Sequence, residues 1–258
     1  MSNSDVARAV VRTVRRREAL VECLLDGRRD KRQLTTDLGV SRSTVDRGIR
    51  DLERHGLVDY EDGEYGLTPL GRTVADGYSV FVERVAVAER LEPFLSVAPP
   101  ALDVDPLHLS DATLAVSKPS DPHAMINLHV ERLRETDDHR LLLPVTGLHA
   151  YEVGHETVVD GGARAESVVT PGVADLYRGD TPYRPLYEAM TATGRYECRV
   201  TEEPIPFYLG VLDDTVQVGV TRENEPHAVL ETRNPAVRRW AKATYREFRE
   251  SARPLGTE

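Results

Sequence analysis

Apolar residues recur at the spacing of an amphipathic helix over residues 5–26, and Gly27 follows them. The positions that share one face are Val6, Val10, Val14, Leu20, Cys23 and Leu24. This pattern predicts a single long helix that buries one face and ends at the glycine.

A second amphipathic pattern fills residues 30–68, which read DKRQLTTDLGVSRSTVDRGIRDLERHGLVDYEDGEYGLT. Asp30 and Ser41 are favoured helix N-caps, and Gly39 between them can adopt the left-handed conformation that ends a helix. The sequence DG further along is typical of a hairpin turn. The order helix, turn, helix, hairpin predicts a winged helix-turn-helix, whose second helix fits the major groove of duplex DNA.

Polar side chains cover the outer face of the second predicted helix and the start of the first. Ser43, Thr44 and Arg47 are placed to read base edges. Phosphate contacts are expected from Lys31, Arg32, Gln33, Arg42, Arg50 and Arg54. The alternative is a helical hairpin whose charged face is only solvated. The hairpin tip, residues 59–64, carries four acidic side chains, so we expect it to contribute little to base reading.

A long linking helix is predicted over residues 69–91, with proline at its first position. Apolar residues recur along it at alternating spacings of four and three, at Val74, Tyr78, Phe81, Val85 and Ala88. Such a seam forms either a dimer interface or a contact with the helix's own domain. Regulators that read two half-sites need two-fold symmetry, which favours the homodimer.

Residues 92–106 hold four prolines and no periodic pattern, which predicts a linker between a domain over 1–91 and another over 107–254. In the second domain, strands are predicted at 113–116, 140–145, 165–169 and 196–200, and helices at 121–135, 148–157 and 183–193. This alternation predicts an α/β sandwich with a largely parallel sheet. A terminal β-hairpin around residues 207–220 and a C-terminal helix after Asn234-Pro235 complete it. The fold expected is an α+β winged helix domain followed by this sandwich.

One segment of the second domain could bind a ligand. Residues 177–187, YRGDTPYRPLY, combine rings with cations that can stack on a small molecule and bind its anionic groups. The candidate ligand-binding residues are Tyr177, Arg178, Tyr183, Arg184 and Tyr208, the last close to Gly210 and Gly219. The alternative is a loop that its tyrosines hold against the surface.

No catalytic motif is found in the chain. The eight histidines are scattered, and HExxH, GxSxG, GxGxxG and a phosphate loop ending in GK[ST] do not occur. We therefore expect no catalytic residues, no metal site, no cofactor and no enzymatic activity. No apolar run reaches the length of a membrane span and no leader opens the chain, which predicts a cytoplasmic protein without a membrane partner.

The formal net charge of −10 is unusual for a DNA-binding protein, but the acidity is unevenly distributed. Residues 1–72 hold 14 Lys and Arg against 13 Asp and Glu, whereas the remainder holds 19 against 30. Only three of the 33 basic residues are lysines. This composition resembles that of proteins from salt-adapted archaea. In molar salt the Debye length is only ~3 Å, so an acidic chain can still bind DNA through close contacts.

Two stretches carry a family resemblance. LGVSRSTVDRGIRDLERHGLV, with the hairpin and LTPLGRTVA after it, resembles the winged helix-turn-helix domains of ArsR- and MarR-type regulators. IPFYLGVLDDTVQVGV and the closing NPAVRRWAKATYREFRESARPL resemble the sensor domain of the archaeal methanogenesis-regulator family, the FilR type. Related sensor domains share a fold with phospholipase D enzymes, whose HxKxxxxD motif is absent from this chain.

The resemblance implies an archaeal transcription regulator, and the composition indicates that the archaeon is salt-adapted, that is, haloarchaeal. It would bind promoter operators on double-stranded DNA as a homodimer, under the control of a small metabolite bound in the second domain. The ligand would change how the two linking helices pack and so change the spacing of the recognition helices. Two alternatives are that the second domain is an enzyme, or that it is a protein-interaction module without a ligand.

Overall fold

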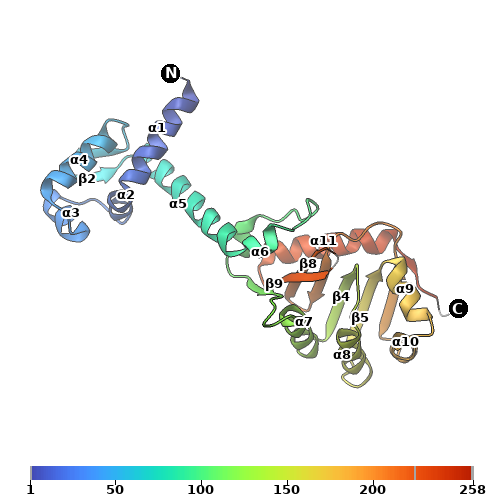
Figure 1. The fold of residues 1–258 in the computed structure, drawn as a ribbon. Helices are drawn as coiled ribbons and strands as arrows, with labels where there is room; N and C mark the ends of the chain where they lie inside the picture. The colour runs from blue at the N-terminus through green and yellow to red at the C-terminus, as the bar shows by residue number, and fades with distance from the viewer. Residues whose placement is uncertain (1, 224, 257–258) are drawn as a thin grey trace. The chain divides into compact units, whose positions relative to one another are not determined.

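The computed structural model describes residues 2–223 and 225–256, which form two compact units. The boundary lies between Ala86 and Val87, inside helix α5 (Pro69–Arg90) (Figure 1). None of the helices in the described ranges is long and apolar enough to cross a lipid bilayer.

The first unit is a small helical domain with a two-stranded hairpin. Its elements before α5 are α1 (Asn3–Arg16), α2 (Glu18–Leu25), α3 (Lys31–Leu38), α4 (Arg42–Glu53), β1 (Val58–Glu61) and β2 (Glu64–Leu67). The predicted caps are confirmed, because Asp30 accepts from the backbone N–H of Gln33 and Ser41 from that of Thr44. Gly39 has φ 62°, the left-handed conformation expected of it.

The prediction of one helix over residues 5–26 is wrong at Arg17, where the backbone leaves the helical conformation with φ −120° and ψ 22°. α1 and α2 meet at this break. The Arg17 guanidinium donates to the carboxylate of Asp51 on α4 at 2.8 Å. This contact spans 34 residues, so the local apolar spacing could not reveal it.

The second unit is built on an eight-stranded mixed sheet in the order β10-β6-β5-β4-β7-β8-β9-β3. The strands are β3 (Thr113–Val116), β4 (Asp138–Leu143), β5 (Arg164–Val169), β6 (Tyr196–Val200), β7 (Tyr208–Leu212), β8 (Thr215–Arg222), β9 (Glu225–Thr232) and β10 (Arg253–Pro254). Among the described strands, only β4–β5 and β5–β6 pair in parallel, so the expectation of a largely parallel sheet is wrong. The predicted β7–β8 hairpin is confirmed, and it adds antiparallel pairs on the other side of β4.

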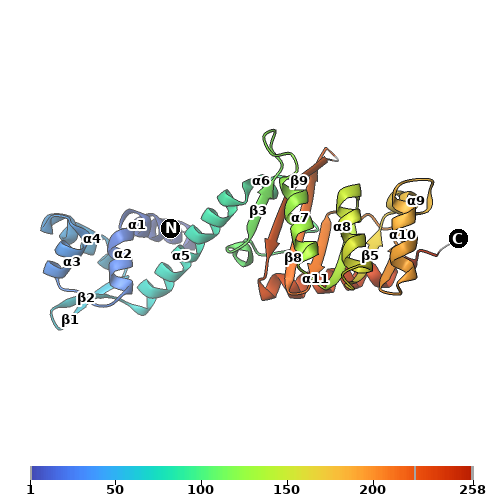
Figure 2. The same ribbon diagram turned by 90° about the horizontal axis from the view of Figure 1, so that it is seen from below.

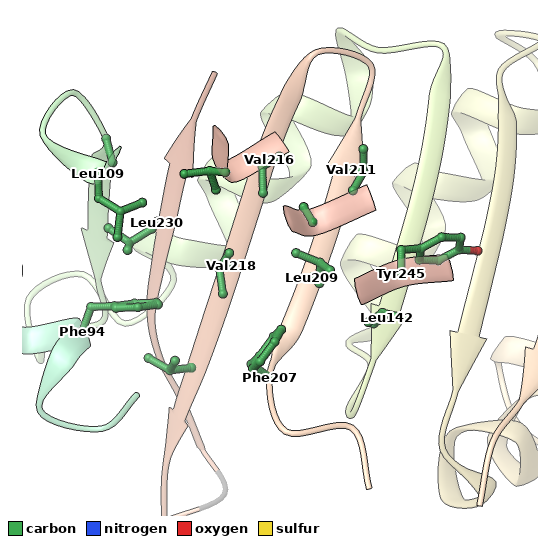
Figure 3. Close-up of a cluster of buried hydrophobic side chains, with 14 of the residues drawn as sticks. Phe94, Leu109, Leu142, Phe207, Leu209, Val211, Val216, Val218, Leu230 and Tyr245 are labelled. Atoms are coloured by element: carbon green, nitrogen blue, oxygen red, sulfur yellow. The ribbon is translucent and has the colours of Figure 1, made fainter. Parts of the chain in front are cut away.

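Helices cover both faces of this sheet (Figure 2). One face carries α7 (Ala124–Arg134), α8 (Leu148–Val159), α9 (Pro171–Arg178) and α10 (Tyr183–Ala192), and the other carries α11 (Pro235–Ser251). Side chains point alternately to the two faces of the sheet along each strand. Val216 and Val218 of β8 point to the α11 face, together with Leu209 of β7 (Figure 3). The residues between them therefore face α7 and α8.

The proline-rich segment 92–106, predicted as a linker, is packed against the second unit. It contains the short helix α6 (Glu92–Leu95), and a 3-10 helix, η1 (Pro106–Leu109), follows it. Phe94 is fully buried in the same cluster as Leu230 (Figure 3). The carbonyl of Pro93 accepts a hydrogen bond from His227 at 3.0 Å. A proline-rich segment has no periodic pattern of apolar residues, so its burial against β9 could not be predicted from the sequence.

Candidate nucleic-acid interface and ligand cavity

Three of the predicted DNA-contacting residues lie together on the exposed face of α4. Ser43, Thr44 and Arg47 are all exposed. The Ser41 hydroxyl lies 3.0 Å from that of Ser43 and 2.9 Å from that of Thr44, which orients both at the start of the helix. Behind them, Val45 and the rest of the inner face of α4 are buried.

The residues predicted to contact phosphate fall into two groups: four arginines are exposed, and two side chains form contacts within the domain. Arg32, Arg42, Arg50 and Arg54 are exposed, although Arg54 lies 3.3 Å from Asp51. Lys31 instead forms an ion pair with Asp46 of α4 at 2.7 Å. The side chain of Gln33 accepts from the backbone N–H of Asp30 at 2.7 Å, completing a capping box. The Lys31 ion pair holds α3 against α4, and the Gln33 side chain helps to cap α3. The residue spacing alone did not indicate these structural roles.

The acidic hairpin tip has a counter-charge that the sequence analysis missed. Arg28 lies 2.8 Å from the carboxylate of Asp59 and 3.8 Å from that of Glu61. Its side chain also packs over Gly66, where an added Cβ would lie 2.7 Å from the guanidinium. Arg28 therefore reduces the negative charge on one side of the hairpin.

The predicted seam on α5 divides into two parts. Val74 and Tyr78 pack against the core of the first unit. Phe81 is 60% exposed and Val85 is 41% exposed, so the continuing seam is an apolar stripe on the helix surface. The C-terminal turn of α5 enters the core of the second unit through the buried Val87.

The tyrosines of the predicted ligand segment lie on α9 and α10 and pack with Tyr151 of α8. Tyr177 is fully buried, with its ring stacked 4.5 Å from that of Tyr151, so it has no surface for a ligand. Tyr183 packs on the same cluster. Arg178 donates to the carbonyl of Gly256 at 2.9 Å, and Arg184 pairs with Glu188 at 2.8 Å. This matches the alternative in which tyrosines hold the segment in place.

A cavity of about 640 Å³ lies on the α7–α8 face of the sheet. Tyr208, alone among the predicted ligand residues, lines it. Its ring lies across the two glycines noted in the sequence, because a Cβ at Gly210 would be 2.3 Å from the Tyr208 hydroxyl and one at Gly219 would be 3.0 Å from its ring. The missing side chains thus make room for the tyrosine. The loop after β4, residues 144–147, closes one side of the cavity, at the carboxyl end of the strand where α/β sheets commonly bind ligands.

A chain of polar side chains runs behind the cavity wall. Arg132 of α7 donates to Glu231 of β9 at 2.7 and 3.1 Å. The Gln217 amide donates to the same carboxylate at 2.7 Å, and its oxygen lies 2.9 Å from Nδ1 of His129. The Tyr208 hydroxyl lies 3.0 Å from that nitrogen. The sequence signal that could have found this group is Gln217, a buried amide among the alternating valines of β8.

Burial keeps the cavity's central titratable groups neutral. It lowers the pKa of His129 to about 4, against a smaller opposing effect of the hydrogen bond with Gln217. Burial also lowers the pKa of His139, whose Nε2 donates to the carbonyl of Thr136 at 2.8 Å. Both imidazoles are therefore uncharged at neutral pH. Across the described residues, no group of three or more His, Cys, Asp or Glu has the arrangement of a metal site.

The solved structures to which this chain is similar share little sequence identity with it. TrmBL2, described as an archaeal chromatin protein with a novel mode of DNA binding, is 14% identical over 96% of this chain and 99% of its own, with a TM-score of 0.41. Nuc from Salmonella typhimurium, a phospholipase D family member, is 14% identical over 55% of this chain and 96% of its own, with a TM-score of 0.44. No curated protein matches the chain.

Two family models match the sequence. The HVO_A0261 N-terminal domain matches residues 5–90. The middle domain of the methanogenesis regulatory protein FilR1 matches residues 122–251, which include α7, α11 and every residue that lines the cavity except Asp121. Because the second match covers half of the chain, the protein belongs to the family defined by the FilR1 middle domain.

Proposed function

We propose that the protein is a sequence-specific DNA-binding transcription regulator. The observation that carries this proposal is the exposed face of α4, where Ser43, Thr44 and Arg47 follow a capped helix-turn-helix and precede a β-hairpin. This is the element order of a winged helix, and the second helix of such a domain enters the major groove. Membership of a family named for a regulatory protein supports the same function.

The proposed DNA-binding form is a homodimer that pairs through α5. The exposed stripe of Phe81 and Val85 continues the heptad seam beyond the part that the first unit covers. Two copies of the stripe would pair around a two-fold axis and place two α4 helices on successive half-sites. The exposed ionic surface and arginine-rich composition fit a salt-adapted archaeal cytoplasm.

The second unit is proposed to be a sensor rather than an enzyme, with its ligand in the 640 Å³ cavity. α5 offers a route for control, because Arg90 at its end donates to the carbonyls of Leu109 and Ala112 at 2.7 and 2.8 Å. A ligand that shifts these contacts would alter α5 packing in the dimer and hence the half-site spacing. Turnover of a bound ligand by the full chain, or half-site spacing unaffected by it, would contradict this part of the proposal.

Selection of bound duplexes from a random library at molar salt tests the DNA-binding function. The wild-type chain is expected to enrich a motif with two-fold symmetry. Ser43→Ala/Arg47→Ala should enrich none, because each lost base contact removes about 1–3 kcal/mol of discrimination. Arg72→Ala, an exposed arginine of the same unit outside α3 and α4, is the matched control and should select the wild-type motif. A motif retained by the double variant would assign base reading to another surface.

A further inference from the structure

The walls of the cavity indicate what kind of molecule it accepts. They are formed mainly by apolar side chains of α7, α8 and the central strands. Among the described residues that line it there is no Lys or Arg, and Asp121 is the one carboxylate. A carboxylate or phosphate ligand would lose its hydration without gaining a lysine or arginine partner. The composition of the wall therefore favours an uncharged ligand.

The hydrogen-bonded side chains behind the cavity wall determine which ring nitrogen of His129 carries the proton. Both side-chain oxygens of Glu231 accept hydrogen bonds from Arg132, so they also act as acceptors toward Gln217. The amide nitrogen of Gln217 must consequently face Glu231, and the amide oxygen must face His129. Two acceptors would repel each other at 2.9 Å, so Nδ1 of His129 carries the proton.

The second ring nitrogen of His129 is then a hydrogen-bond acceptor. His129 is neutral, so a proton on Nδ1 leaves a lone pair on Nε2. His129 is half-buried as a residue and lines the cavity. No described residue forms a hydrogen bond with Nε2. The atom is also not fully buried. The cavity thus offers a fixed acceptor that a ligand can reach.

We propose that the cavity binds an uncharged, largely apolar molecule bearing a hydroxyl or N–H group that donates to Nε2 of His129. The volume of about 640 Å³ is in the range of pockets for small organic ligands. This assignment rests on the proposed sensor function and specifies the chemistry of its effector.

Isothermal titration of the full chain with three naphthalene probes tests the assignment. 1-Naphthol carries the donor, 1-methoxynaphthalene lacks it, and 1-naphthoate carries a negative charge. Naphthol is expected to bind about tenfold more tightly than either of the others, since an unmatched polar contact in a buried site costs about that factor. His129→Phe keeps a ring of similar shape without the acceptor and should abolish the preference. His155→Phe, on α8 but outside the cavity, should retain it.

Equal affinity for the three probes, tighter binding of naphthoate, no binding of naphthol, or an unchanged preference in His129→Phe would each overturn the assignment. The comparison of naphthol with methoxynaphthalene on the wild-type chain covers the case in which His129→Phe does not fold, because that comparison needs no variant. The titrations contain no DNA, so a chain that binds naphthol but no duplex would refute the proposed function and leave the ligand class standing.

Discussion

At the scale of single residues, the second unit depends on one connected set of buried polar groups. The Gln217 amide joins Glu231 to His129, and each group satisfies the hydrogen-bonding need of the next. Replacing one member would leave its neighbour buried and unpaired, which costs more than the bond itself gains. The sequence could predict the face of the sheet on which Gln217 lies but not its partners, which come from α7 and β9.

The depressed pKa of His129 predicts a pH dependence of stability. Between about pH 6.5 and pH 4 the unfolded chain takes up a proton at this residue and the folded chain does not. The stabilisation is therefore complete above about pH 6.5 and is lost as the pH falls toward 4. Melting temperatures of the wild type and His129→Phe over this range should show a shallower decline for the variant. A remaining slope is expected, since burial also lowers the pKa of His139; identical slopes in the two proteins would contradict the buried neutral state of His129.

At the scale of elements, local signals were sufficient for the caps and the turn of the helix-turn-helix, and insufficient where an element depends on distant partners. The caps Asp30 and Ser41 and the turn at Gly39 act within a few residues, so the sequence predicted them correctly. The break at Arg17 and the burial of Phe94 depend on partners far along the chain. Strand direction also depended on tertiary pairing, because β7 joins the sheet antiparallel to β4.

The start of α5 provides a test of packing at the element scale. A Cβ on Gly71 would lie 1.9 Å from the backbone oxygen of Leu57, which cannot move aside without disturbing β1. Gly71→Ala is expected to lower the free energy of unfolding by about 3 kcal/mol. Gly77→Ala on the same helix has open space and should raise it by ~0.5–1 kcal/mol through helix propensity. Chemical denaturation followed by circular dichroism measures both, and equal effects would contradict the packing of α5 on Leu57.

At the scale of the whole molecule, α5 is the element shared by the two units. The first unit buries Ala75 of this helix and the second buries Val87, while the apolar stripe of Phe81 and Val85 between them is exposed. The heptad spacing predicted this seam, but only the packing separates its buried part from its free part. A charge on the free part would oppose pairing with a second copy, since it would have to be buried in the interface.

Phe81→Glu is therefore expected to convert a dimer into a monomer. Val80→Glu introduces the same charge on the neighbouring residue, which is 47% exposed but lies outside the seam, and should leave the dimer intact. Light scattering after size-exclusion chromatography at molar salt distinguishes the two states. A monomeric wild type, or loss of the dimer in both variants, would contradict pairing through this seam.

The most direct test of the central claim is genome-wide occupancy in native cells that express the wild type, Ser43→Ala/Arg47→Ala or Arg72→Ala. If α4 reads DNA, the wild type and Arg72→Ala will give discrete promoter peaks that disappear in the double variant at equal protein abundance. Peaks that persist in the double variant would contradict the assignment of base reading to α4. An absence of peaks for the wild type would contradict DNA binding itself.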